Sequence, residues 1–368
     1  MTRFSRRVAG IEVSGIRKWF EGAGPGAINL GLGQPDLDTP THIKAAACRA
    51  IEEGRTGYTP NGGIPELQEA IAAKSRRENG LEFSPGQVIV TAGASEALHI
   101  AMQALVDDGD RVLVADPAFV SYAALASMAG GRPEGLLLDN RFHVDVEAAK
   151  ERMDGAKVLV LNSPANPTGA VEPADSVRAL AEYADDAGVT ILSDEVYEHF
   201  VYDGARMTSP GRFGENVVTI NATSKTYAMT GWRLGWLAGP DEVVAQAVKV
   251  HQYCQACATS IAQYAAVEAL NGPQDCVQAM REEYAARRTL LCDGLVAMGI
   301  DTPRPEGAFY LFAPMADDLV RRIIAAGVTI VPGEAFGPAG AGHARIAYSA
   351  SRGDITTALD RIRGVIDD

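Results

Sequence analysis

Lys225 lies in a segment whose residue types suit covalent chemistry on a carbonyl group. The segment reads Ser224-Lys225-Thr226-Tyr227-Ala228-Met229-Thr230-Gly231-Trp232-Arg233, and the chain has seven lysines against twenty-six arginines, so a lysine is uncommon here. A lysine attacks carbonyls as the neutral amine, which requires burial or a neighbouring cation to lower its pKa. Arg233, eight residues further on, is suited to grip a phosphate. The segment therefore indicates a Schiff-base enzyme.

Two other segments offer contacts to the phosphate and ring of a flat cofactor. Gly93-Ala94-Ser95 lies between an apolar run and a helical pattern, where free N–H groups and the helix dipole favour an anion. The alternative is a plain turn with Ser95 as the helix cap. Asn166, in Asn166-Pro167-Thr168-Gly169, has an amide that suits a phenolate-like oxygen, and the alternative is a β-turn.

Four more side chains complete the candidate set. Asp194 and Tyr197 end a strongly apolar run, where they would contact a protonated ring nitrogen and a ring oxygen; the alternatives are an N-cap aspartate and a half-buried tyrosine. Phe119 would stack on the cofactor or pack in the core. Arg345 would clamp a substrate carboxylate or form a surface ion pair. With Lys225, these groups match what pyridoxal phosphate requires.

Short apolar runs separated by helical patterns must position these groups. The runs cover residues 88–90, 111–114, 158–161, 189–192 and 217–220. They predict βαβ units and an α/β fold with a mostly parallel sheet. Because ligands bind beyond the carboxyl ends of such strands, we expect Ser95, Asn166, Asp194 and Lys225 to converge at one edge.

The pattern changes from about residue 290. A helix over 290–298, a strand over 307–312, a helix over 319–326, strands over 328–331 and 344–348 and a final helix predict a smaller α+β domain. Residues 17–40 are expected to join it. We therefore predict an N-terminal arm and part of the small domain over 1–45, a large cofactor-binding domain over 46–285 and a small C-terminal domain over 286–368.

Composition narrows the class of protein. The net charge of −14 and pI of 4.9 argue against nucleic acid as a partner. No run approaches the roughly 18 apolar residues of a membrane span, and the basic start at Met1 to Arg7 lacks the apolar core of a signal peptide, so a cytoplasmic location is predicted. Five scattered cysteines indicate reduced thiols.

One cysteine pair has a spacing that could bind a metal ion. His251 precedes Cys254-Gln-Ala-Cys257, but no second pair with ligand spacing follows and the segment reads as helix. No metal site is therefore predicted.

On these motifs the chain resembles the class I/II aminotransferases of the fold-type-I pyridoxal-phosphate superfamily, nearly end to end. The matching segments are residues 28–36, 58–67, 166–169, 193–197, 224–236 and 307–310. Residues 195–200 and 251–264 look most like the archaeal aspartate and aromatic aminotransferases. The fold implied is a large domain with a mostly parallel sheet flanked by helices, plus a smaller α+β domain.

The resemblance also implies a role for each candidate residue. Lys225 would be the Schiff-base lysine and proton-transfer base, and Asp194 would pair with the pyridine nitrogen. Tyr58 would reach the phosphate in the neighbouring subunit, so the resemblance implies a homodimer with shared active sites. The remaining implied contacts are Gly93, Ala94, Ser95, Ser224 and Arg233 around the phosphate, Phe119, Asn166 and Tyr197 around the ring, and Gly33, Asn166 and Arg345 around the substrate.

The chain departs from the family pattern at three points. Ala222 stands where many members carry a phosphate-binding serine, so that contact is either lost or moved to Ser224 or Thr223. Phe119 stands where several aspartate-specific members have tryptophan. No residue obviously supplies a second arginine for the distal carboxylate of a dicarboxylic substrate.

The implied activity is ping-pong transamination from aspartate or an aromatic amino acid to a 2-oxo acid, expected to be 2-oxoglutarate. An alanine-specific or broad-specificity transaminase and a β- or γ-lyase on the same fold remain as alternatives. A cofactor-binding regulator is disfavoured by the acidic charge.

Overall fold

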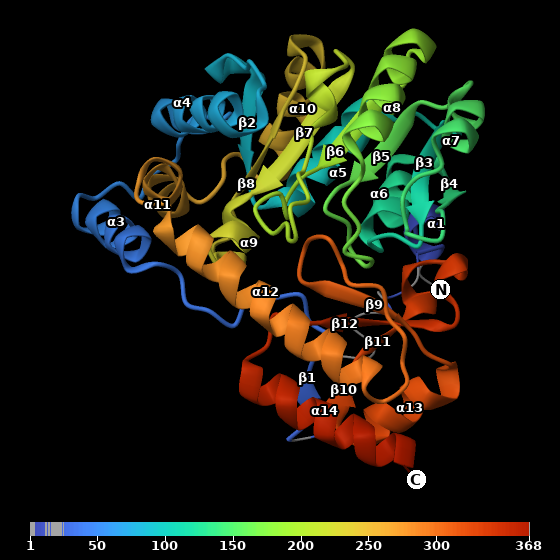
Figure 1. The fold of residues 1–368 in the computed structure, drawn as a ribbon. Coiled ribbons are helices and arrows are strands. Elements are labelled where there is room, and N and C mark those ends of the chain that lie inside the picture. The colour runs from blue at the N-terminus through green and yellow to red at the C-terminus, as the bar shows by residue number, and fades with distance from the viewer. Residues whose placement is uncertain (1–3, 12, 14, 16–23, 25, 368) are drawn as a thin grey trace.

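A seven-stranded sheet forms the centre of the larger unit in the computed structural model, which describes residues 4–11, 13, 15, 24 and 26–367 (Figure 1). In spatial order the strands are β2 (Val88–Thr91), β8 (Gly235–Ala238), β7 (Val217–Ala222), β6 (Thr190–Asp194), β5 (Val158–Asn162), β3 (Arg111–Asp116) and β4 (Arg132–Leu137). Among the described strands of this sheet, β8 is the one that runs opposite to the others, so its pairings with β2 and β7 are antiparallel. The predicted mostly parallel sheet is confirmed.

Side chains of the central strands alternate between two apolar layers, because successive residues of a strand face opposite sides of the sheet. Val112 and Val158 join one layer, while Leu113 and Leu159 join the other. The first layer is covered by α5 (Ala94–Leu105), α6 (Ser121–Ala129) and α10 (Asp241–Cys254). The second is covered by α7 (Val146–Met153) and α8 (Ala174–Ala187). Strands buried on both faces explain the continuous apolar runs of the sequence.

Three further helices pack against β2 and β8. They are α3 (Thr41–Glu52), α4 (Pro65–Lys74) and α11 (Ser260–Asn271). The shorter helical segments are α1 (Arg6–Ala9), a π-helix at Ser75–Asn79, α9 (Thr223–Thr226) and single turns at Pro85–Gln87, Pro210–Arg212, Thr230–Trp232, Gly333–Phe336 and Pro338–Gly340. No helix in the described part of the chain has the length and apolar character to cross a membrane.

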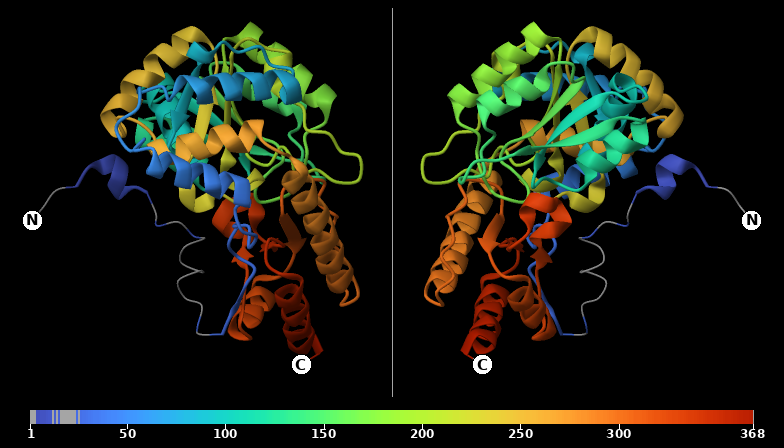
Figure 2. Two further views of the ribbon diagram at one scale, coloured as in Figure 1. Left: turned by 90° about the vertical axis from the view of Figure 1, so that its left-hand side faces the viewer. Right: turned by 90° about the vertical axis from the view of Figure 1, so that its right-hand side faces the viewer.

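The second, smaller unit lies on one side of the first, in orange and red (Figures 1 and 2). Its antiparallel sheet has the order β11 (Val331–Pro332), β12 (His343–Ala347) and β9 (Tyr310–Pro314). Its helices are α12 (Asp275–Val296), α13 (Asp317–Ala325) and α14 (Arg352–Asp367). Near the N-terminus, β1 (Ile28–Asn29) pairs in parallel with β10 (Val328–Thr329), so these two residues lie against this unit, and the assignment of the whole stretch 17–40 to it stays a prediction. The rest of the arm predicted over 1–45 lies partly outside the described residues, at 1–3, 12, 14, 16–23 and 25.

Three predicted elements have other boundaries. The helix predicted over 290–298 is the second half of α12, whose Val277 packs in the larger unit and whose Leu291 packs in the smaller one. The strand predicted over 307–312 begins only at Tyr310, because Ala308 has a φ of 55° and interrupts the extended chain. The run 328–331 splits into β10 and β11, which pair with different partners. The predicted domain boundary at 285/286 falls inside α12 and stays a prediction.

Gly235 allows β8 to lie close to the start of α5. A Cβ built on Gly235 would lie 2.6 Å from the Ala94 nitrogen, 2.7 Å from the Gly93 carbonyl carbon and 2.8 Å from the Asn221 oxygen. All three are backbone atoms, which a side chain cannot displace by rotating. The contact brings the first residue of β8 to the same edge as the carboxyl ends of β2 and β7.

We therefore expect Gly235→Ala to destabilise the protein by about 1–3 kcal/mol, the usual cost of overpacking. Gly231→Ala is the matched control, since nothing lies within 4 Å of a Cβ at that position. The measurement is the thermal unfolding midpoint at one protein and one cofactor concentration. Equal midpoints for the two variants would contradict the close packing.

Candidate active site

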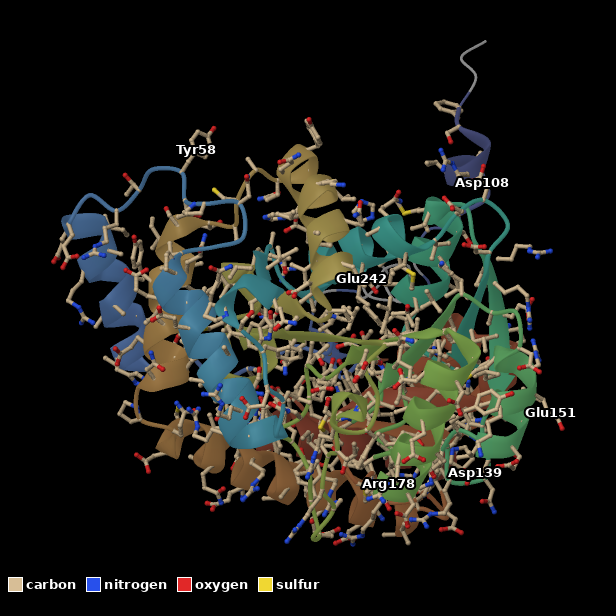
Figure 3. The ribbon with its side chains drawn as sticks, turned by 90° about the horizontal axis from the view of Figure 1, so that it is seen from above. Tyr58, Asp108, Asp139, Glu151, Arg178 and Glu242 are labelled. Carbon is tan, nitrogen blue, oxygen red and sulfur yellow. The ribbon has the colours of Figure 1, made fainter. Side chains whose placement is uncertain are left out.

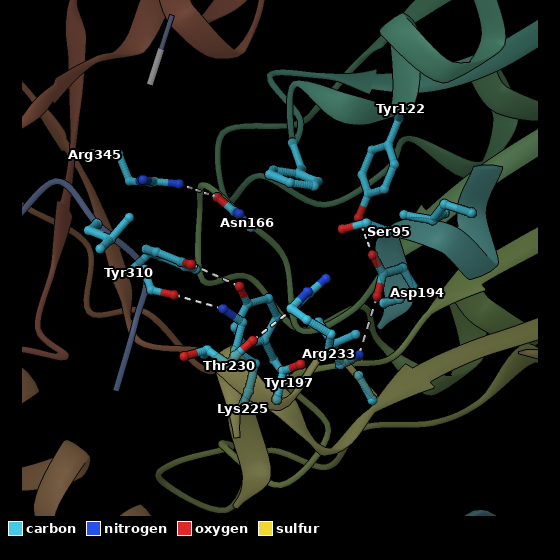
Figure 4. A pocket seen from close by; sticks show the side chains of 18 residues that line it. Ser95, Tyr122, Asn166, Asp194, Tyr197, Lys225, Thr230, Arg233, Tyr310 and Arg345 are labelled. Atoms are coloured by element: carbon cyan, nitrogen blue, oxygen red, sulfur yellow. Dashed lines mark hydrogen bonds between the residues drawn. The ribbon is translucent and has the colours of Figure 1, made fainter. Parts of the chain in front are cut away.

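A cavity of about 230 Å³ opens where the carboxyl ends of the parallel strands face the smaller unit (Figure 4). Most of the predicted site residues line it, namely Gly33, Ala94, Ser95, Phe119, Asn166, Asp194, Tyr197, Ser224, Lys225, Arg233 and Arg345. Residues far apart in the sequence thus converge at one edge. Gly93 and Tyr58 are the two predicted residues that do not line the cavity.

Lys225 enters the cavity from α9, directly after β7. Its Nζ donates to the carbonyl oxygen of Gly33 at 2.7 Å. Burial, followed by the positive charges of Arg345 and Arg233, lowers the pKa of Lys225 to about 8, while the negative charge of Asp194 acts in the opposite direction. A lysine with this pKa is neutral in a sizeable minority of molecules near neutral pH, as a nucleophilic amine requires.

Asp194 is the last residue of β6 and is 4% exposed. Its Oδ2 accepts from the Tyr122 hydroxyl at 2.7 Å, and its Oδ1 accepts from the Val196 N–H at 3.3 Å. Burial raises the pKa of this carboxyl to about 6, and the Tyr122 hydrogen bond opposes the rise. The alternative of an N-cap is wrong, because no described helix begins after β6 at this point.

Tyr197 and Asn166 face the cavity from loops after β6 and β5. Tyr197 is buried, so the half-buried alternative is wrong, and its hydroxyl lies 2.8 Å from the Tyr310 hydroxyl. The Asn166 Oδ1 accepts from Arg345 Nη1 at 2.8 Å. This bond uses the acceptor end of the Asn166 amide, so its Nδ2 group is the end that remains to donate to a ligand.

Arg345, on β12, is 2% exposed, which makes the surface ion pair wrong. Its guanidinium lies between the rings of Tyr310 and Phe336, at 4.5 and 4.7 Å from their centroids. No described carboxylate lies within 4.0 Å of it, and its buried Nε lacks a hydrogen-bond partner. A buried cation without a counter-charge is costly unless a ligand supplies one. The geometry therefore suits a carboxylate ligand.

The opposite end of the cavity is built for an anion. Helix α5 begins at Ala94, so the N–H groups of Ala94 and Ser95 have no carbonyl partner within the helix. Arg233 lies beside them, where it donates from Nη1 to the Thr230 oxygen at 2.9 Å and from Nη2 to the Ala92 oxygen at 3.3 Å. In the described chain Arg233 makes no salt bridge, so its charge is available to a phosphate.

Gly93 supports this anion site from behind rather than lining it. It is the N-cap of α5, with a φ of 82°, so the alternative of Ser95 as cap is wrong. A Cβ on Gly93 would lie 2.5 Å from Arg233 Nη2, which means that a side chain here would push the guanidinium away.

Four smaller contributions complete the cavity wall. Phe119 presents a ring to the cavity and packs edge-on against Tyr122. Ala222, the last residue of β7, lines the wall without a hydroxyl, and Ser224 lines it two residues later. Gly33 allows close packing, since a Cβ there would lie 1.7 Å from the Tyr310 hydroxyl oxygen.

Tyr58 lies at the surface, between α3 and α4, and is 93% exposed (Figure 3). It does not reach the cavity of its own chain. Its exposure fits a contact outside the chain, which stays a prediction.

Sequence reasoning did not assign three polar residues of the cavity, namely Tyr122, Thr230 and Tyr310. Tyr310 stands in the matched segment 307–310 and Thr230 in the lysine segment, so their neighbourhoods were visible. The contact of Tyr122 with Asp194 joins residues 72 positions apart and leaves no local signal.

Two clusters outside the cavity bear on metals. His251 Nδ1 lies 2.9 Å from Glu96 Oε1, so this histidine is engaged by a carboxylate of α5. Among the described residues Glu78, Glu198 and His199 are close enough to share an ion. The ammonium group of Lys74 already forms salt bridges with both glutamates, and a second cation there would be repelled.

The comparisons with known proteins agree with this geometry. A family model described as aminotransferase class I and II matches residues 25–362. A probable aspartate aminotransferase of Methanocaldococcus jannaschii is 42% identical, covering 99% of this chain and all of the relative. An aromatic-amino-acid aminotransferase of Thermococcus litoralis is 40% identical, with 98% of both chains covered. The solved aspartate aminotransferase of Thermus thermophilus with maleate superposes with a TM-score of 0.93 at 40% identity, over 99% of this chain and all of that one.

Fold and site together define a pyridoxal-phosphate-dependent transferase of the α/β class. The chain belongs to the class I and II aminotransferase family. Its substrates are accordingly amino acids and 2-oxo acids.

The residues present fit the cofactor of this family. One cavity is lined by a lysine with a lowered pKa, by a buried carboxylate, and by a helix N-terminus beside an arginine that has no carboxylate partner among the described residues. These are the groups that an aldehyde, a phosphate and a pyridine nitrogen call for.

Proposed function

We propose that this protein transfers the amino group of aspartate or an aromatic amino acid to a 2-oxo acid, with 2-oxoglutarate as the expected acceptor. The observation that carries the proposal is the placement of Lys225 and the uncompensated guanidinium of Arg345 in one cavity. An amino acid held by its carboxylate at Arg345 presents its α-carbon toward the lysine. The relatives named for aspartate and for aromatic amino acids support both donors.

The chain's own groups would hold the cofactor at three points. Lys225 Nζ would hold the aldehyde carbon, and the N–H groups of Ala94 and Ser95 with Arg233 would hold the phosphate. Asp194 would accept from the ring nitrogen, which keeps that nitrogen protonated. Bound pyridoxal phosphate supplies an electron-accepting ring that stabilises the charge left at the α-carbon when its proton departs.

The remaining residues orient and move protons. The Lys225 amine, when not joined to the cofactor, would take the α-proton, because its lowered pKa favours the neutral form that can accept one. Asn166 Nδ2 and the Tyr197 hydroxyl would donate to the ring oxygen. Phe119 would cover one ring face. Ser224 lines the cavity and would offer its hydroxyl to the phosphate, whereas the Thr223 hydroxyl donates to the Leu234 oxygen at 3.3 Å and Thr223 does not line the cavity.

The cavity leaves both donor classes open. Its cationic lining residues are Lys225, Arg233 and Arg345, so the part of the chain that the structure describes offers no further cation there for the second carboxylate of aspartate. Leu32 and Phe119 add apolar surface that suits an aromatic side chain. The Thermus thermophilus relative was solved with maleate, a dicarboxylate, which keeps aspartate in the proposal.

A donor panel tests this function. Aspartate, phenylalanine, tyrosine and alanine are each supplied with 2-oxoglutarate, and glutamate formation is measured. We expect aspartate or the aromatic donors to lead and Lys225→Ala to lose roughly 10³-fold or more in turnover, since proton transfer alone contributes about 10²–10⁴-fold. Lys249→Ala, on the exposed face of α10, is the control. Turnover without an oxo acid would point to a lyase and overturn the proposal.

We further propose that two copies form a homodimer in which Tyr58 of each copy completes the other's phosphate site. Tyr58 is exposed and remote from its own cavity, which supports a contact in trans. We also propose a cytoplasmic location, which fits the five free thiols in the described part of the chain.

Mixing subunits tests the shared site. Tyr58→Ala should lower activity at limiting cofactor, and Lys225→Ala abolishes it. After co-refolding equal amounts, half of the dimers are hybrids with one intact site, so about a quarter of wild-type activity should return. Tyr253→Ala, which removes another exposed aromatic side chain, should keep its activity before mixing. Activity equal to the average of the two parents would show that Tyr58 does not act in trans.

A further inference from the structure

We propose that Tyr122 is a positioning residue that holds both Asp194 and Phe119 in place against the cofactor ring. The inference rests on the proposed function, in which Asp194 meets the ring nitrogen and Phe119 covers a ring face. It assigns to Tyr122 two separable tasks, one for its hydroxyl and one for its ring.

The hydroxyl of Tyr122 fixes the Asp194 carboxylate. The two side chains are both buried, and the hydroxyl donates to Oδ2 at 2.7 Å (Figure 4). The other protein donor to this carboxylate in the described chain is the Val196 N–H, at a longer 3.3 Å on Oδ1. Tyr122 is therefore the stronger of two restraints on a carboxylate that has little freedom to be solvated by water.

The ring of Tyr122 supports Phe119. The two rings meet edge to face, with centroids 5.5 Å apart and planes at 80°, an attractive geometry. The Tyr122 N–H also donates to the Phe119 carbonyl at 3.1 Å, which fixes the two backbones at the start of α6. Phe119 is only partly buried, so a neighbouring ring restricts its motion at the cavity wall.

The charges around Asp194 determine the sign of the hydroxyl's effect. The titratable side chains that interact electrostatically with Asp194 are Tyr122, Tyr197 and Lys225. Burial raises the pKa of Asp194, whereas the Tyr122 hydrogen bond and the Lys225 charge lower it. Removing the hydroxyl must raise that pKa further. Asp194 would then take up a proton at a higher pH and would be a weaker partner for a protonated ring nitrogen.

Two substitutions separate the tasks. Tyr122→Phe removes the hydroxyl and keeps the ring, while Tyr122→Leu removes both. We expect the acidic limb of the kcat pH profile to move to higher pH in both variants, with kcat falling roughly 10-fold, as for a lost hydrogen bond to a charged group. Only Tyr122→Leu should also weaken cofactor affinity, about 2- to 10-fold, through loss of the aromatic pair.

A spectroscopic readout does not depend on turnover. With pyridoxal phosphate labelled with ¹⁵N in the ring, the nitrogen chemical shift reports the protonation of that atom in each loaded variant. Tyr122→Phe should shift it toward the unprotonated value. Tyr202→Phe is the control, because it removes a buried hydroxyl that binds the Ala308 carbonyl at 2.6 Å, away from Asp194. It should leave both the shift and the pH profile unchanged.

Three outcomes overturn the assignment, and a fourth points to the role of Asp194 instead. An unchanged nitrogen shift and pH profile in Tyr122→Phe, or equal changes in Tyr202→Phe, would reduce Tyr122 to a packing residue. If Asp194→Ala also leaves the nitrogen shift unchanged, the fault lies with the proposed role of Asp194. Should Tyr122→Phe fail to fold, 3-fluorotyrosine at position 122 keeps the packing and donates more strongly, so it should move the acidic limb to lower pH; no movement would refute the proposal.

Discussion

The site depends on positive charge that the described part of the protein leaves largely unneutralised. Lys225, Arg233 and Arg345 line one cavity, and the carboxylate among its lining residues is Asp194. Burial, followed by the positive charges of Arg345 and Arg233, lowers the pKa of Lys225. Such an arrangement is costly in an empty protein and favourable once a phosphate lies at Arg233 and a carboxylate at Arg345. The same positive charges thus lower the pKa of the Lys225 amine and favour the binding of a phosphate together with a carboxylate.

The fold gathers these charges from separate directions. Parallel β6 and β7 deliver Asp194 and Lys225 at their carboxyl ends. Strand β8 runs the other way, so the residues just before it, including Arg233, reach the same edge. Arg345 comes from the smaller unit and stays in place between two aromatic rings. The cavity therefore exists only where the two units meet, which ties catalysis to their packing.

Much of this was predictable from the sequence, and the remainder has a physical reason. The strands before Asp194 and Lys225 are continuous apolar runs. The polar residues that follow these runs predicted that the site lies at the carboxyl ends of the strands. Strands β4 and β8 were not predicted. The start of α12 was predicted too late, because that helix packs in both units and lacks one apolar face. The hydrogen bond between Tyr122 and Asp194 could not be predicted, since a contact between residues 72 positions apart leaves no characteristic spacing in the sequence. The sequence left two roles open for Arg345, a carboxylate clamp or a surface ion pair, and only its burial separates them.

Covalent capture of pyridoxal phosphate at Lys225 tests the central electrostatic claim most directly. Cofactor-free protein is mixed with pyridoxal phosphate over a range of pH, reduced with borohydride and mapped by peptide mass spectrometry. We predict modification at Lys225 among the seven lysines, increasing with pH as the amine loses its proton, with a midpoint that moves to higher pH in Arg345→Gln. Modification spread over other lysines, or a midpoint that Arg345→Gln leaves unmoved, would contradict that claim.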